Sequence, residues 1–198
     1  MRWERISIWL VIAVGVVFYI GLILLKNHVQ KSLIDMIKRK QFDKFDRNSQ
    51  KILVKFLFPP YNLEYLRLNR YLISDDKEKI DQQFELLLRS AKQSQKKDIF
   101  LKAFEYYAFD GDEVKAKKYY NELIKINKKN ISKYITLLYD VFILKKHNHI
   151  EELERDFNNL NSNQKKFVAQ LLVAQYQNKK DVRKQKFYEK FLLSQNSD

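Results

Sequence analysis

The sequence predicts an all-α protein in which an apolar N-terminal helix precedes a series of helix pairs. Gly and Pro are scarce, with three and two of 198 residues, whereas helix-forming residues are abundant. Beyond Lys26 the apolar residues recur every three or four positions, as in Phe84, Leu87 and Leu88. Polar turn signals interrupt this pattern at nearly regular intervals, which favours paired helices of similar length.

Residues 6–25 read ISIWLVIAVGVVFYIGLILL, a run of twenty residues without a charge. A helix of this length is about 30 Å long, which matches the hydrocarbon core of a bilayer. The run is long for a signal peptide, and no small-x-small cleavage site follows it. We therefore expect a retained transmembrane helix at 6–25, a short N-terminal tail at 1–5 and a helical repeat domain at 26–198.

The charges beside this run indicate an orientation. The tail offers Arg2 and Arg5, whereas the other flank offers Lys26, Lys31, Lys38, Arg39 and Lys40. By the positive-inside rule, this asymmetry favours a single-pass protein of the cell membrane whose C-terminal domain faces the cytoplasm.

Turn signals behind the apolar run predict a repeat. If Lys40, Asp75, Gly111, Asn148 and Lys179 are equivalent turn positions, their spacings are 35, 36, 37 and 31 residues. A period near 34 residues that holds two helices is typical of tetratricopeptide arrays. The acidic residues at these turns, such as Asp76 and Asp112, suit the positive end of the helix that follows.

The segment GDEVKAKKYYNELIKINKKN, residues 111–130, resembles the second half of a tetratricopeptide repeat. Gly111 and Asp112 match its inter-helix turn, Ala116 its small packing residue, and Tyr119 with Tyr120 its aromatic pair. The other repeats carry larger residues in place of Ala116: Phe45, Ile80, Leu153 and Lys184. The resemblance covers residues 29–193 and implies a right-handed α-solenoid of about five helix pairs.

Such a solenoid buries the apolar stripe of each helix pair against its neighbours and presents an extended concave groove. The resemblance implies that the first helix of each pair lines this groove. The candidate groove residues are then Tyr65, Asn69, Leu101, Glu105, Phe109, Phe142 and Lys145. The alternative is that the apolar members of this set simply belong to the core.

Composition excludes several classes of site. The chain has no Cys, which excludes disulfides, thiolate nucleophiles and Cys-ligated metals. Only Gly111 lies outside the apolar run, so a glycine-rich phosphate loop cannot form. His147 and His149 lack a clearly placed third ligand, and we read them as a solvated turn. We expect no enzyme, no metal and no cofactor.

The net charge of +14 favours anionic partners. A candidate basic face comprises Lys115, Lys117, Lys118, Lys125, Lys128 and Lys129. The sequence thus predicts a membrane-anchored interaction adaptor that binds another protein in its solenoid groove or against its basic flank. The positive charge favours an acidic partner. The alternative is a basic helical domain that binds an anionic polymer or a membrane surface. Its ligand would then be nucleic acid, a cell-wall polymer or acidic lipid. The sequence carries no nucleic-acid-binding signature, which disfavours nucleic acid.

Overall fold

The computed structural model describes residues 2–127 and 132–195, without the side chains of residues 2–13 and 127. The chain divides into two compact units, residues 1–92 and 93–198, and each is described by itself. The described residues contain helices and connecting turns and no strand, so the all-α prediction is confirmed. The prediction of one continuous solenoid through both units stays a prediction.

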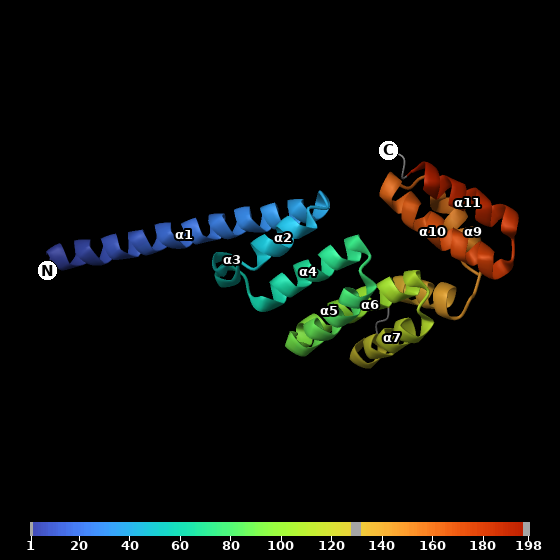
Figure 1. The fold of residues 1–198 in the computed structure, drawn as a ribbon, viewed down its shortest axis with the longest axis horizontal. Coiled ribbons are helices and arrows are strands. Elements are labelled where there is room, and N and C mark those ends of the chain that lie inside the picture. The colour runs from blue at the N-terminus through green and yellow to red at the C-terminus, as the bar shows by residue number, and fades with distance from the viewer. Residues whose placement is uncertain (1, 128–131, 196–198) are drawn as a thin grey trace. The chain divides into compact units, whose positions relative to one another are not determined.

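Unit 1 begins with a long helix and ends with a helical hairpin (Figure 1). Its helices are α1 (Arg2–Lys38), α2 (Phe42–Ser49), α3 (Ile52–Leu57), α4 (Pro60–Ser74) and α5 (Lys77–Ser90). The last part of α1 packs on α2, α3 and α4 around Leu33, Ile37, Phe45, Val54, Phe58 and Leu63. In the α4–α5 hairpin, Leu68, Ile80 and Phe84 are fully buried.

Among the residues that the structure describes, no helix is both long and apolar enough to cross a membrane. Residues 6–13 of the predicted span lie outside the part whose side chains are described. The remaining residues, 14–25, form about 18 Å of helix, whereas a hydrocarbon core is about 30 Å thick. After residue 25, α1 continues through charged residues to Lys38. The predicted single-pass transmembrane helix at 6–25, its cell-membrane location and the cytoplasmic orientation are therefore contradicted.

Unit 2 contains two further hairpins and a distorted helix between them (Figure 1). Its helices are α6 (Gln93–Asp110), α7 (Glu113–Asn127), α8 (Lys133–Leu138), the π-helix η1 (Tyr139–Ile143), α9 (Ile150–Phe157), α10 (Ser162–Lys179) and α11 (Val182–Ser194). Helices α6 and α7 form one hairpin, and α10 and α11 form the other. The second hairpin shares a core with α9 that includes Ile150, Leu172, Tyr176 and Tyr188.

Left-handed backbone conformations occur at evenly spaced turns. The described residues with positive φ are Lys40, Asp75, Gly111, Lys145 and Lys180. Their spacings are 35, 36, 34 and 35 residues. Three of these positions coincide with predicted turns. The other two correct the predicted register, because the turn residues are Lys145 instead of Asn148 and Lys180 instead of Lys179. The positions equivalent to Ala116 then become Ile150 and Gln185 rather than Leu153 and Lys184.

Three of these turns share a side-chain pattern, Tyr-x4-Asp-x2-Lys. It comprises Tyr71, Asp76 and Lys79; Tyr107, Asp112 and Lys115; and Tyr176, Asp181 and Lys184. In each turn the Asp carboxylate accepts a hydrogen bond from the backbone N–H of the Lys, which caps the following helix. In each turn the Lys ammonium lies 5.0–5.8 Å from the centre of the Tyr ring. Through this Lys–Tyr contact, the pattern stabilises the packing of the second helix of each pair on the first.

Two of the hairpins that carry this pattern, α6–α7 and α10–α11, also share a ring stack. Tyr119 on α7 stacks on Tyr107 at 5.5 Å, and Tyr188 on α11 stacks on Tyr176 at 5.9 Å. Both pairs are nearly parallel, with interplanar angles of 5° and 11°. The hairpins α6–α7 and α10–α11 therefore use the same device to set the distance between their helices.

Candidate functional site

Three candidate groove residues lie on one face of α6. Leu101, Glu105 and Phe109 recur every four residues, and side chains at this spacing share a helix face. Leu101 and Glu105 are half-buried, and Phe109 is 38% exposed. Along the helix axis these positions span about 12 Å. This face of α6 therefore remains in part accessible to a ligand.

Aromatic rings from four elements meet at the end of this face. The Phe109 ring lies 4.7 Å from the Phe142 ring of η1 and 6.0 Å from the Phe167 ring of α10. Tyr134 of α8 lies 5.8 Å from Phe167. Burial, then the negative charge of Glu105 and the hydrogen bond of the Tyr134 hydroxyl with it, raise the pKa of Tyr134 above its usual range. The phenol therefore stays neutral and tethers α8 to α6.

A hollow of about 310 Å³ opens beside Phe109 and Phe142. Its lining comprises Ala108, Phe109, Gly111, Val141, Phe142, Lys145, Ala174, Gln177 and Asn178. Ligand pockets in proteins begin at about this volume. The hollow combines an aromatic wall with one cation and two side-chain amides, so it can accept an apolar group next to a polar or acidic one.

The polar rim of the hollow is partly fixed. The side-chain amide of Asn178 donates hydrogen bonds to the carbonyl oxygens of Val141 and Lys146, at 2.9 and 3.0 Å. Lys145 reaches Glu113 on α7, with 2.7 Å between Nζ and the carboxylate. Both side chains of this ion pair are more than half exposed, so the pair contributes little stability and can exchange partners.

The π-helix η1 positions Phe142 and Lys145, and a buried polar cluster holds it in place. Asp140 of η1 accepts hydrogen bonds from Lys146 at 2.8 Å and from His149 at 3.2 Å. Burial raises the pKa of Asp140, but these hydrogen bonds outweigh burial and hold it below its usual range. The backbone N–H of His149 donates to Gln175, whose side chain is fully buried. π-helical turns occur frequently at functional sites.

The remaining candidate groove residues lie in unit 1. Tyr65 and Asn69 are half-buried on α4, and the Tyr65 ring contacts that of Tyr61 at 6.1 Å. The structure thus brings Phe109, Phe142 and Lys145 together around one hollow, with Leu101 and Glu105 on the adjoining face of α6. It assigns Tyr65 and Asn69 to the other unit.

The predicted basic face is interrupted by local partners. Lys115 pairs with Asp112 and covers the Tyr107 ring, Lys118 covers the Tyr119 ring, and Lys125 pairs with Glu122. Lys117 is exposed. Lys128 and Lys129 lie outside the described residues. These contacts direct several of the six cations toward their own helix pair.

The predicted packing residues both contact the neighbouring helices. Ala116 is fully buried. Tyr120 is half-buried; its ring lies 5.6 Å from Phe104 of α6 and stacks on Tyr139 of η1 at 3.8 Å. The neighbouring Tyr119 also packs within the α6–α7 hairpin, where it stacks on Tyr107. Both tyrosines therefore pack against α6, and Tyr120 also contacts η1.

A second polar cluster, centred on Glu154 of α9, was not expected from the sequence. Its carboxylate accepts hydrogen bonds from Tyr176 at 2.7 Å, Tyr188 at 2.9 Å and Lys184 at 3.1 Å. Burial raises the pKa of Glu154, but the three donors outweigh burial and hold it below its usual range. The sequence places Glu154 in an acidic run at a helix start, which suggested only a favourable end charge. The repeated Tyr-x4-Asp-x2-Lys pattern was the available signal for its tyrosine and lysine partners.

No protein-family model matches this sequence, and neither the curated proteins nor the solved structures contain a match. Among the described residues, no group of three or more His, Cys, Asp or Glu side chains is arranged to hold a metal ion. The tetratricopeptide resemblance gains no support from these comparisons, so the function is argued from the geometry of the site.

Proposed function

We propose that this chain is a protein-interaction module that binds a segment of a partner protein along α6 and in the hollow beside Phe109 and Phe142. The observation that carries the proposal is the hollow itself, in which an aromatic wall lies next to Lys145 and two side-chain amides. In this proposal the module is a tetratricopeptide-like helical repeat that works by binding rather than by catalysis.

The dimensions favour a short peptide segment as ligand. The partly accessible face from Leu101 to Phe109 is about 12 Å long, which corresponds to about four residues of extended chain. One large apolar side chain of the partner would occupy the hollow, where Phe109 and Phe142 supply contact area. Lys145 and Gln177 at the rim would bind a carboxylate of the partner, and the side-chain oxygen of Asn178 would accept a hydrogen bond from a main-chain N–H.

Selection of peptides from a random library on the full chain tests the proposal. Binding of a selected peptide is then measured by fluorescence anisotropy for wild type, Phe109→Ala and Phe142→Ala. We expect each substitution to weaken binding about tenfold or more, because buried aromatic contacts dominate such interfaces. Lys117→Ala on the exposed face of α7 serves as the control and should change binding by less than about twofold.

A salt titration separates this function from binding of an anionic polymer. A ligand held by the aromatic hollow should lose little affinity between low and high salt, whereas a polyanion should lose affinity steeply. Selected peptides that bind the Phe109→Ala and Phe142→Ala variants as tightly as wild type would overturn the proposal.

A further inference from the structure

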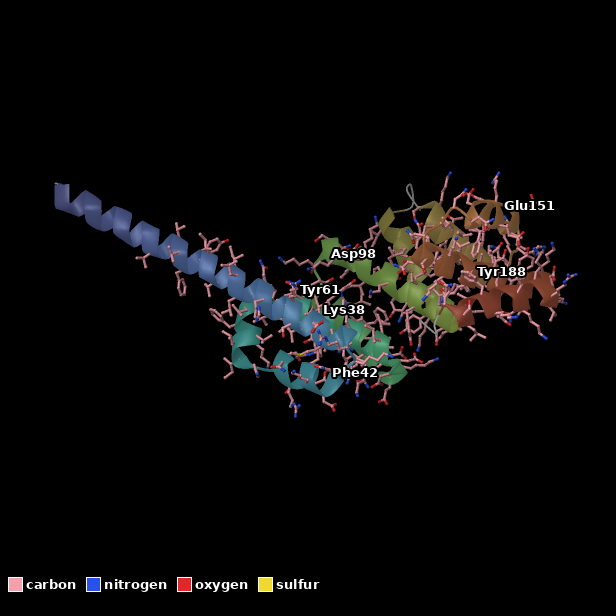
Figure 2. All side chains as sticks on the ribbon, turned by 90° about the horizontal axis from the view of Figure 1, so that it is seen from above. Lys38, Phe42, Tyr61, Asp98, Glu151 and Tyr188 are labelled. Carbon is pink, nitrogen blue, oxygen red and sulfur yellow. The ribbon has the colours of Figure 1, made fainter. Side chains whose placement is uncertain are left out.

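The outer face of α11 carries a stripe of exposed apolar and basic side chains. Val182, Phe187 and Leu193 are 58%, 62% and 69% exposed. Arg183, Lys186 and Lys190 are exposed beside them. Positions 183, 186, 187, 190 and 193 follow the three-and-four spacing of one helix face. The opposite face carries Tyr188, which is buried against α9 and α10 (Figure 2).

The basic residues of this stripe have carboxylates close by in sequence but form no ion pair with them. Among the residues that the structure describes, none forms an ion pair with Arg183, Lys186 or Lys190. The nearest carboxylates on the same helix pair are engaged elsewhere: Asp181 caps α11, and Glu189 accepts a hydrogen bond from Gln185. A hollow of about 490 Å³, lined by Asp181, Arg183, Lys184 and Phe187, lies at the N-terminal end of the stripe. Around the helix, the three cations lie between Phe187 on one side and Val182 with Leu193 on the other, so the stripe presents a basic row bordered by exposed apolar groups.

We propose that this face binds an acidic amphipathic helix of a partner protein. From Val182 to Leu193 the stripe is about 17 Å long, or about three turns of a partner helix. A row of carboxylates along the middle of its contact face would pair with Arg183, Lys186 and Lys190. Apolar side chains on the two sides of that row would cover Phe187 and, on the other side, Val182 and Leu193. Helix-on-helix packing uses the same three-and-four spacing on both partners. A flexible polyanion would satisfy the cations but would leave Val182 and Leu193 in water.

This surface is distinct from the hollow beside Phe109, and its residues do not line that hollow. The two binding modes can therefore be tested separately, and failure of one leaves the other unaffected.

The probe is a synthetic amphipathic peptide of about 20 residues, because shorter isolated helices are marginal in water. Its contact face carries a central row of Glu with Leu on both sides of that row. Two control peptides have the same residues in scrambled order, or Gln in place of Glu. Binding to the full chain is measured by fluorescence anisotropy. We expect the amphipathic acidic peptide to bind at least about tenfold more tightly than either control peptide.

Variants of the full chain test both parts of the stripe. Phe187→Ala should weaken binding about tenfold, and the double variant Arg183→Glu with Lys186→Glu should weaken it by a larger factor. Matched controls on α7 are Val114→Ala and Lys117→Glu, which change an exposed apolar residue and an exposed lysine and should have little effect. Because Phe187 is mostly exposed, its substitution should leave the far-UV circular dichroism spectrum unchanged.

Two outcomes would overturn the proposal. The first is equal binding of the scrambled and amphipathic peptides, which would indicate attraction of charge without recognition of a helix. The second is tighter binding of a single-stranded polyuridine probe than of the acidic peptide, with the same sensitivity to Phe187→Ala. That result would identify nucleic acid as the ligand of the stripe, with a base stacked on Phe187.

Discussion

Replacement of Tyr188 by Phe should loosen the second hairpin of unit 2 by a small, defined amount. The substitution removes one hydroxyl, which donates a hydrogen bond of 2.9 Å to Glu154, and keeps the ring that stacks on Tyr176. Hydrogen bonds to charged groups contribute about 1.5–3 kcal/mol. The Glu154 side chain is 30% exposed, so solvent screening reduces the expected loss to about 1 kcal/mol.

Hydrogen exchange measured by mass spectrometry on peptides from α10 and α11 reports this loss locally in the full chain. Tyr188→Ala is the comparison, because it also removes a buried ring and should cost about 3–5 kcal/mol. Combination of Tyr188→Phe with Glu154→Gln should be less than additive, because both changes act on the same hydrogen bond. If Tyr188→Phe left the exchange of both helices unchanged, the assigned role of the Glu154 cluster would be wrong.

Three further predictions concern the turns, the packing and the pH dependence. Gly111→Ala should lower the free energy of unfolding by about 1 kcal/mol, because φ is +82°; the cost stays this small because no atom within 4 Å obstructs the added Cβ. Lys180→Gly should raise the free energy of unfolding by about the same amount, because Lys180 also has a positive φ. Urea unfolding followed by circular dichroism measures both. Ala116→Leu should cost about 1–3 kcal/mol because the site is fully buried, whereas exposed Lys117→Ala should stay within about 0.5 kcal/mol in the same assay. The pKa of Asp140 is lowered in the folded chain, so ionised Asp140 stabilises the fold above the pKa of an unfolded aspartate, about 3.9. This stabilisation is lost as the pH falls through the lower folded value. Asp140→Asn should therefore reduce the fall in melting temperature at acidic pH, measured by thermal unfolding at successive pH values.

The helical class and three of the five left-handed turns could be predicted from local sequence. At Asp75 and Gly111, the turn residue is followed at once by an Asp that caps the next helix, so the polar signal marks the turn itself. At Lys145 the signal fails, because the polar cluster His147 to His149 follows the turn residue by two positions. The π-helix immediately before it also shifts the register by one residue, which a count of helical periods does not detect.

The candidate site was only partly predictable, since its residues come from elements far apart in sequence. The alignment behind the groove prediction selected Phe109, Phe142 and Lys145, which line one hollow. It could not show that Tyr65 belongs to a different unit, because no composition shift marks the boundary near residue 92. The transmembrane prediction depended on residues 6–25 as a whole, whereas the described side chains begin at residue 14.

Adjacent aromatic residues illustrate why packing partners escape a local analysis. Tyr119 and Tyr120 differ by one helical step, and either could face the preceding helix. Both rings pack against α6, Tyr119 on Tyr107 and Tyr120 beside Phe104, and Tyr120 also stacks on Tyr139 of the next element. Spacing alone predicts that an aromatic residue packs here but does not identify its partner.

The ring stacks within the hairpins have a consequence for the order of folding. Each stack joins residues only twelve positions apart, so each hairpin can close as soon as its own two helices exist, including during synthesis on the ribosome. Helix α9, by contrast, depends on residues that are synthesised later. Its Glu154 depends on Tyr188, which follows thirty-four residues later. Among the helices of unit 2, α9 should therefore acquire its protection only after α10 and α11 have paired, and it should be the first to lose that protection when their contact is broken.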